Sequence, residues 1–156
     1  DPALVEADSP EMTELFAEMA RRGTIIDAGY SLYRGPEGRN CAPSLMTEIA
    51  KAAHRAGVPL STGTDWFTED TDPFPSVIVE VERLVEGGIL TPAEAITAAT
   101  LNGARATGLE ESHGTIEAGK VANLVVLSGN PLQDIRAIRS VVTVYQRGRA
   151  YPRADY

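Results

Sequence analysis

The 156-residue sequence predicts an α/β fold followed by a small antiparallel β module. Between residues 9 and 86, helical and extended segments alternate in the order helix, strand, helix, strand, helix, which favours parallel βαβ units. After Gly114 the pattern changes to short extended runs separated by turn residues, which indicates antiparallel strands. We therefore expect two structural units, residues 1–110 and residues 111–156.

The composition is typical of a folded globular domain, with 43% hydrophobic and 23% charged residues. A formal net charge of −8 argues against nucleic acid or an anionic membrane as a partner, because both require clustered Lys and Arg. No apolar run approaches the roughly 20 residues of a membrane span. The single cysteine, Cys41, cannot form an internal disulfide. These features lead us to expect a cytoplasmic protein.

The first helix is predicted from Ser9, which is placed to act as the N-cap before Pro10 at the first helical position. Apolar residues then recur at helical spacing up to Gly23. A short strand is predicted at 24–27, so Asp27 lies close to the end of that strand. Asp27 could belong to a site, but a hydrogen-bonded structural role is the better interpretation of a lone Asp in this position.

A second strand is predicted at 58–64, after a helix that runs from Ser44 to Ala56. Asp65 follows this strand directly, so its carboxylate lies at the carboxyl end, where ligands and metals bind in parallel α/β architectures. The simpler alternative is an Asp that begins a loop or caps a helix. His54 lies on the flank of the preceding helix, and we expect it to be structural or exposed.

The remaining helices have clear local signals. Ser76 is predicted to cap a helix that ends at Gly87, and Thr91-Pro92-Ala93-Glu94 is a capping box before a helix at 95–101. Asn102 is predicted to cap a further short turn. In the antiparallel module, the expected strands are at 115–116, 121–127 and 141–146.

Two parallel strands do not complete an α/β sheet, and a few antiparallel strands form a sandwich with open edges. The sequence is therefore interpreted as the last quarter of a barrel joined to part of a small β-sandwich. Such a chain exposes strand edges and apolar helix faces, and association into a homo-oligomer is one way to cover them.

Four segments together closely resemble the C-terminal half of the amidohydrolase superfamily, within which the imidazolonepropionase and prolidase-like group is most similar. These segments are S-T-G-T-D at 61–65, L-T-P-A-E-A-I-T-A-A-T-L-N-G-A-R-A-T-G-L at 90–109, G-T-I-E-A-G-K-V-A-N-L-V-V-L at 114–127 and N-P-L-Q-D-I at 130–135. The resemblance covers residues 44–151 and implies the C-terminal part of a (β/α)8 TIM-type barrel with the C-terminal strands of a small β-sandwich.

The resemblance implies a hydrolase of carbon–nitrogen bonds that uses one or two divalent metals, usually zinc. Asp65 matches the family's Asp at the end of the eighth barrel strand, which binds the metal, takes a proton from the attacking water and delivers it to the leaving group. Trp66 and Phe67 follow where family members line the pocket for a small-molecule substrate, although loop aromatics also serve as packing anchors.

The sequence departs from the family pattern in its metal ligands. The family's H-x-H pair, its Lys or Glu bridge and two further His ligands have no match, and His54 and His113 occupy other positions. A catalytic zinc needs about three protein ligands. We therefore expect that the N-terminal part of the barrel is missing from this chain. Two hypotheses stay open: part of a metal-dependent amidohydrolase, or a catalytically inactive fragment that serves as an assembly or binding module.

Overall fold

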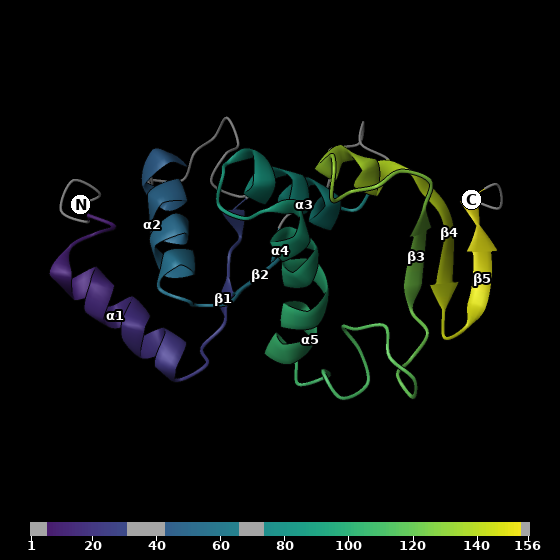
Figure 1. Ribbon diagram of the computed structural model, residues 1–156, viewed down its shortest axis with the longest axis horizontal. Helices are drawn as coiled ribbons and strands as arrows, with labels where there is room; N and C mark the ends of the chain where they lie inside the picture. Colours follow the sequence, from purple (N-terminus) through teal and green to yellow (C-terminus); the bar gives the residue numbers. More distant parts are fainter. Residues whose placement is uncertain (1–5, 31–42, 66–73, 154–156) are drawn as a thin grey trace.

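The computed structural model describes residues 6–30, 43–65 and 74–153. A helical α/β part comes first and a three-stranded antiparallel sheet last, at the opposite side of the molecule from the first helix (Figure 1). The elements in chain order are α1 (Pro10–Arg21), β1 (Ile26–Asp27), α2 (Pro43–Arg55), β2 (Leu60–Ser61), α3 (Ser76–Glu86), α4 (Pro92–Thr97), the π-helix η3 (Ala98–Asn102), α5 (Gly103–Ala106), β3 (Leu124–Leu127), the 3₁₀-helix η4 (Ile135–Arg139), β4 (Val141–Gln146) and β5 (Arg149–Pro152).

Helix α1 begins as its sequence predicts. The Ser9 side chain accepts a hydrogen bond from the Met12 amide at 3.3 Å, and Pro10 occupies the first turn, where its missing N–H costs nothing. The apolar face of α1 contributes Phe16, which is buried with Ala53 of α2 and Val58 in one core cluster. Burial of this face therefore joins α1 and α2 side by side.

Strands β1 and β2 form a parallel pair in which Ile26 lies opposite Leu60 and Asp27 opposite Ser61. The backbone bond from the Ala28 amide to the Ser61 carbonyl, 3.1 Å long, extends the ladder by one residue. Both strands are shorter than the predicted ranges 24–27 and 58–64, because only two residues of each form a paired ladder with the other strand. Within the described residues the sheet stops at two strands, so no closed barrel is formed.

The main core surrounds Leu60 and is built largely by α3 and α4. Leu84 is fully buried, and Ala95 and Ala98 are small enough for α4 and η3 to pack closely against it. The predicted N-cap of α3 is wrong by one position, because Pro75 occupies it and makes no side-chain cap bond. Ser76 is instead the first helical residue, which frees its hydroxyl for a contact outside the helix.

The predicted capping box at the start of α4 is confirmed. Thr91 Oγ1 accepts from the Glu94 amide at 3.4 Å, and Glu94 Oε2 accepts from the Thr91 amide at 2.8 Å. The expected simple helix at 95–101 is wrong, because five residues, Ala98–Asn102, form a π-helix between α4 and α5. Asn102 is in helical backbone conformation and does not cap α5, as the sequence had suggested.

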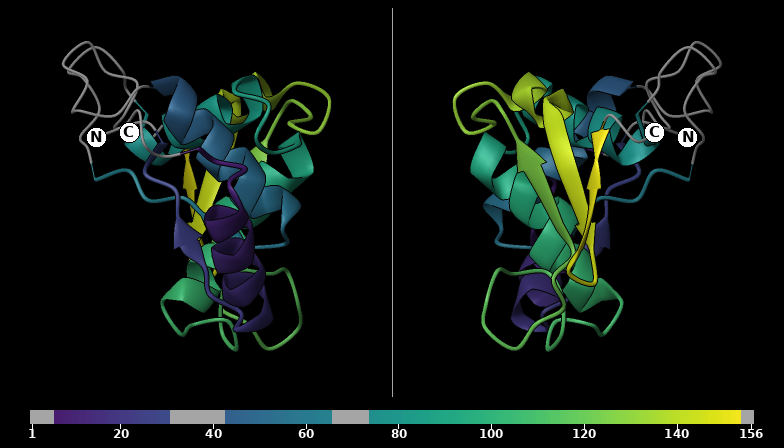
Figure 2. Two further views of the ribbon diagram at one scale, coloured as in Figure 1. Left: turned by 90° about the vertical axis from the view of Figure 1, so that its left-hand side faces the viewer. Right: turned by 90° about the vertical axis from the view of Figure 1, so that its right-hand side faces the viewer.

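The C-terminal sheet has the order β3-β4-β5, with every neighbour antiparallel (Figure 2). The predicted strand at 141–146 matches β4, whereas the one at 121–127 is shortened to β3. The expected strand at 115–116 is absent, and the Ile116 side chain is 86% exposed. Strand β5 follows a two-residue turn at Arg147 and Gly148, whose positive φ angles of 49° and 81° suit a tight hairpin.

Part of this sheet is apolar and exposed. Val125 and Val142 are exposed on β3 and β4, and within the described residues no strand pairs with the outer edge of β3. Such edges favour association.

None of the described helices is long and apolar enough to cross a bilayer.

The capping box gives a prediction about acid stability. Hydrogen bonds from the Thr91 side chain and amide, with a smaller contribution from His54, lower the pKa of Glu94 below its ordinary value of 4.5. A lowered folded-state pKa stabilises the fold above the ordinary value, and this contribution disappears as the pH falls through the lowered pKa. Because Glu94 is partly exposed, Glu94→Gln should lower the free energy of unfolding at pH 7 by only about 0.5 kcal/mol.

Urea unfolding of both proteins between pH 7 and pH 3 measures this difference, which should shrink towards zero at the acid end. Glu117→Gln is the matched control, because the Glu117 carboxylate is exposed and lies 4.0 Å from its partner Lys120. A Glu94→Gln difference that stays constant with pH would show that the carboxylate charge is not what stabilises the helix start.

Candidate active site

The carboxyl ends of β1 and β2 lie at the same edge because the strands are parallel and in register. A carboxylate is close to each end. Asp27 is the last residue of β1, and Asp65 follows four residues after β2; both are exposed. The strand ends therefore present two acidic side chains towards solvent from neighbouring strands.

Asp27 packs against the backbone that follows β2. A Cβ atom added to Gly63 would lie 1.7 Å from Asp27 Oδ1, a separation that no side chain tolerates. Glycine at 63 thus leaves room for the Asp27 carboxylate in its present position. Within the described residues the Asp27 carboxylate accepts no hydrogen bond, so the expected hydrogen-bonded role is not observed and Asp27 acts here by close packing.

Asp65 has a backbone φ of +42°, in the left-handed region that most residues avoid. Asp tolerates this region better than most residues, because its short polar side chain can interact locally. A non-glycine residue persists there only where the surroundings hold it, and such positions cluster at functional sites. The conformation thus marks Asp65 as a candidate for function.

The end of β2 is held by side chains from two other elements. Asn102 Nδ2, at the end of η3, donates to the Leu60 carbonyl at 2.8 Å. The Ser76 hydroxyl, at the start of α3, donates to Thr64 Oγ1 at 3.0 Å. Thr64, the residue before Asp65, is therefore held by α3, and β2 itself is held by the π-helix. Short π-helical segments are often found near functional sites.

Sequence reasoning missed both contacts. Asn102 was assigned to a helix cap because Asn is favoured there, but an Asn inside an Ala-rich helical run is itself unusual and is a signal for a tertiary hydrogen bond. Ser76 carries no comparable signal. Trp66 and Phe67, the predicted substrate contacts, lie outside the described residues, so they remain predictions.

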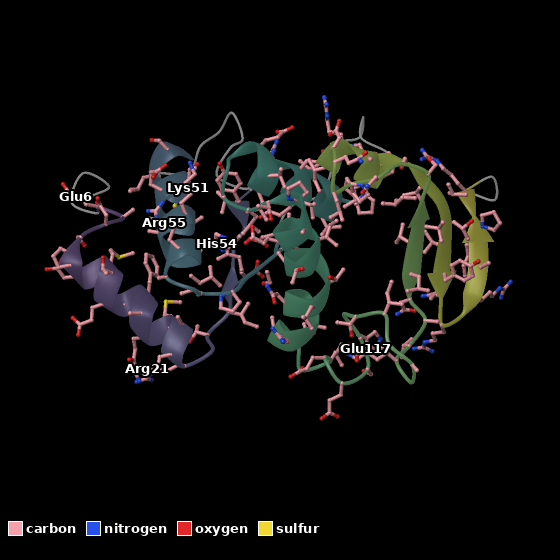
Figure 3. All side chains as sticks on the ribbon, viewed as in Figure 1. Glu6, Arg21, Lys51, His54, Arg55 and Glu117 are labelled. Atoms are coloured by element: carbon pink, nitrogen blue, oxygen red, sulfur yellow. The ribbon has the colours of Figure 1, made fainter. Side chains whose placement is uncertain are left out.

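Neither histidine reaches the strand ends. His54 lies on α2 (Figure 3). Its Nε2 atom is 3.3 Å from Glu94 Oε1, within the distance of a polar contact. His113 Nδ1 instead pairs with the Ser112 hydroxyl at 2.8 Å. Both histidines are thus engaged in local contacts, and the expectation that His54 is structural agrees with its position.

The described part of the chain contains no group of three or more His, Cys, Asp or Glu side chains placed to hold a metal ion. A catalytic zinc requires about three protein ligands. Among the residues singled out from the sequence, Asp65 and Asp27 could each supply one carboxylate ligand from this edge. The described residues by themselves therefore do not fit a complete metal centre.

A model of the amidohydrolase family matches residues 12–150. The chain belongs to the amidohydrolase family. It is 43% identical over 77 residues to the imidazolonepropionase of Flavobacterium johnsoniae, covering 49% of this chain and 18% of the relative. It is 33% identical over 105 residues to the ochratoxinase of Aspergillus niger, covering 65% of this chain and 21% of the relative. The predicted family is confirmed.

Solved structures support the same assignment. A Xaa-Pro dipeptidase with bound methionine superimposes with a TM-score of 0.70 and 26% identity over 92% of this amidohydrolase chain and 37% of its own. The A. niger ochratoxinase gives a TM-score of 0.71 and 27% identity over 94% and 35%. The chain therefore spans about a fifth of the curated relatives and just over a third of these solved structures.

The close approach at Gly63 gives a second prediction. Gly63→Ala should force the exposed Asp27 side chain to rotate away and should lower the free energy of unfolding by about 1 kcal/mol. The matched control is Gly103→Ala, where the added Cβ would meet its nearest atom at 3.7 Å and the helical backbone suits alanine. That control should be neutral or stabilising by up to about 1 kcal/mol.

Denaturant unfolding of both variants measures the contrast. Equal and small effects at the two positions would mean that the ends of β1 and β2 are not packed as described.

Proposed function

We propose that this chain is the C-terminal part of a metal-dependent amidohydrolase that cleaves carbon–nitrogen bonds in a small-molecule substrate. The bonds proposed are non-peptide amides, cyclic amides or amidine-type bonds, or the bond of a dipeptide-type substrate. The observation that carries the proposal is the position of Asp65, just beyond the carboxyl end of a parallel strand in a chain that belongs to the amidohydrolase family. The names imidazolonepropionase and Xaa-Pro dipeptidase among its relatives agree with this range of substrates.

Asp65 is proposed to handle the proton. A carboxylate within hydrogen-bond reach of the attacking water accepts its proton as the water oxygen adds to the carbon of the C–N bond. The same carboxyl group then donates the proton to the leaving nitrogen. Its exposure and its restrained backbone suit this task, because the group must meet substrate and yet keep one position.

A divalent metal, zinc above all, is proposed as the cofactor, with Asp65 as one ligand. Zinc lowers the pKa of bound water towards about 7. The other ligands are proposed to come from the N-terminal part of the barrel, since the described residues offer no group of three. Trp66 and Phe67 are proposed to contact the substrate.

A second candidate function follows from the same ligand count. The alternative is that the chain on its own is a catalytically inactive fragment that serves in assembly or binding, and the lack of a three-ligand group among the described residues favours it. Exposed valines on β3 and β4 offer a surface for such association. Both cases predict well under one equivalent of zinc on the purified chain. Elemental analysis tests this shared ligand count, because a chain that binds stoichiometric zinc, lost in Asp65→Asn, must contain further ligands.

The main test replaces Asp65 in an intact amidohydrolase that contains this chain. Asp65→Asn keeps the size of the side chain and tolerates the left-handed backbone, but it removes the basic carboxylate. The turnover rate should fall by about 100-fold or more. The melting temperature should change little.

His54→Ala is the control, because His54 pairs with Glu94 away from the strand ends and its loss should leave turnover nearly unchanged. Bound metal and melting temperature are measured on the same samples. Near-normal turnover by Asp65→Asn would remove the proposed link between this chain and hydrolysis.

A further inference from the structure

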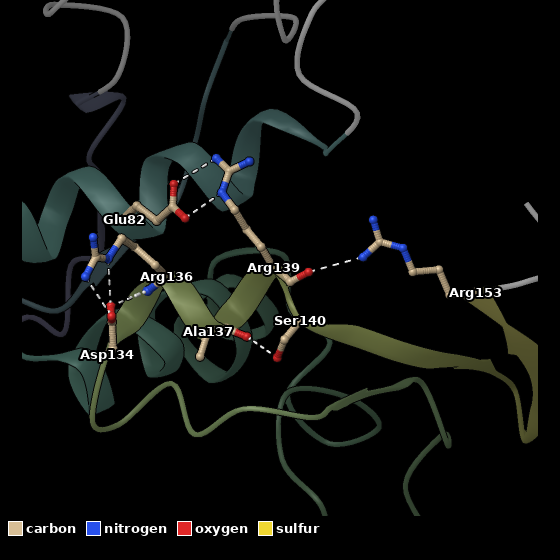
Figure 4. A network of polar contacts seen from close by, with 7 residues as sticks. All are labelled: Glu82, Asp134, Arg136, Ala137, Arg139, Ser140 and Arg153. Carbon is tan, nitrogen blue, oxygen red and sulfur yellow. Dashed lines mark hydrogen bonds and ion pairs between the residues drawn. The ribbon is translucent and has the colours of Figure 1, made fainter.

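The junction between the α/β part and the C-terminal sheet is built around one arginine. Arg139, the last residue of η4, binds Glu82 of α3 with two parallel bonds, Nε to Oε1 at 2.6 Å and Nη2 to Oε2 at 2.8 Å (Figure 4). The Glu82 side chain is only 12% exposed and that of Arg139 31%. A planar guanidinium bound at two points to a buried carboxylate keeps a single orientation.

The oriented guanidinium lies against an aromatic ring. The Arg139 Cζ atom is 5.2 Å from the centre of the Phe74 ring, and Arg153 Cζ, just beyond β5, is 5.1 Å from it. Both distances fall within the roughly 6 Å range of cation–π attraction. Arg153 Nη1 also donates to the backbone carbonyl of Arg139 at 3.3 Å, so the Arg153 side chain is tied to the end of η4 (Figure 4). Two arginines of the C-terminal module, which comprises β3, η4, β4 and β5 with the residue after it, thus contact the Phe74 ring.

Phe74 is two residues from the contact that fixes the end of β2. Ser76, at the start of α3, donates to Thr64 Oγ1, and Thr64 is bonded covalently to Asp65. Only Pro75 lies between Phe74 and Ser76, so the two arginines contact the chain close to the hydroxyl that binds Thr64. The left-handed backbone at Asp65 depends on such surrounding contacts.

We infer that Arg139 is a positioning residue, which fixes the Asp65 end of β2 through Phe74 and the Ser76–Thr64 hydrogen bond. The C-terminal module then controls the geometry at the strand ends from a different structural unit. The positional part of this inference stands on the contacts alone, whereas its meaning for catalysis rests on the proposed function.

The first arm of the test uses the 156-residue chain and nuclear magnetic resonance. Arg139→Met removes the guanidinium, and Phe74→Leu removes the ring while it leaves the Arg139–Glu82 pair intact. The second variant keeps the test valid if the first fails to fold with an unpaired Glu82. Both should shift the amide signals of Thr64 and Asp65.

The matched control is Arg136→Met, three residues earlier on η4, where the guanidinium pairs with exposed Asp134 at 2.8 Å (Figure 4). This control should leave the Thr64 and Asp65 signals in place. Unchanged signals in both Arg139→Met and Phe74→Leu would overturn the inference, whatever the role of Asp65.

The second arm measures kinetics in an intact amidohydrolase that contains the chain. Arg139→Met and Phe74→Leu should lower kcat roughly tenfold with KM within about twofold, since a small misplacement of a catalytic group costs rate. Arg136→Met should stay within about twofold of the parent in both constants.

Three separate variants of the same enzyme are compared. If Asp65→Asn is inactive but Arg139→Met and Phe74→Leu keep the kcat of the parent, the catalytic part of the inference is overturned. If Asp65→Asn is itself active, the proposed function fails. Shifted signals at Thr64 and Asp65 would then still support the positional part.

Discussion

The parallel pairing of β1 with β2 is the constraint on which the rest of the structure depends. Ile26 packs against both hydrophobic clusters, so the strand pair joins the α1–α2 layer to the core beneath α3 and α4. The same pairing places Asp27 beside Gly63 and leaves Asp65 at the shared edge. If the register shifted by one residue, buried Leu60 would turn outward and the strand ends would lose this packing.

Side chains from distant parts of the chain converge on this short pair. Asn102 from the π-helix binds the strand backbone, and Ser76 from α3 binds the residue before Asp65. Asn102 binds a carbonyl within β2, and Ser76 binds the segment that follows the strand. The strand end is thereby held without a third strand among the described residues. This arrangement is how a two-residue ladder can support a residue with a left-handed backbone.

Local signals in the sequence were sufficient for the features that depend on neighbouring residues. Ser9 at α1 and the Thr91–Glu94 capping box are short-range hydrogen bonds, and both are present. Strand β4 is rich in β-branched residues, and its predicted bounds match the structure to the residue. The family assignment followed from four motifs and is confirmed, and the position of Asp65 after a strand was predictable from the residues that flank it.

Features that depend on distant partners were not predictable. The strands around Leu60 are shorter than their propensity suggests, because pairing requires a neighbour that sequence does not supply. The π-helix arises where Asn102 reaches a carbonyl 42 residues away. Helix η4 was missed because its five residues give too short an apolar pattern, yet it supplies buried Ile135 to the core and Arg139 to the junction.

The central claim is that Asp65 is the group through which this chain takes part in metal-dependent hydrolysis. Anomalous diffraction at the zinc edge, from crystals of a zinc-loaded amidohydrolase that contains the chain, tests it directly. The account predicts an anomalous peak about 2.0–2.2 Å from an Asp65 carboxylate oxygen. A fully occupied zinc in the barrel whose ligands do not include Asp65 would contradict it.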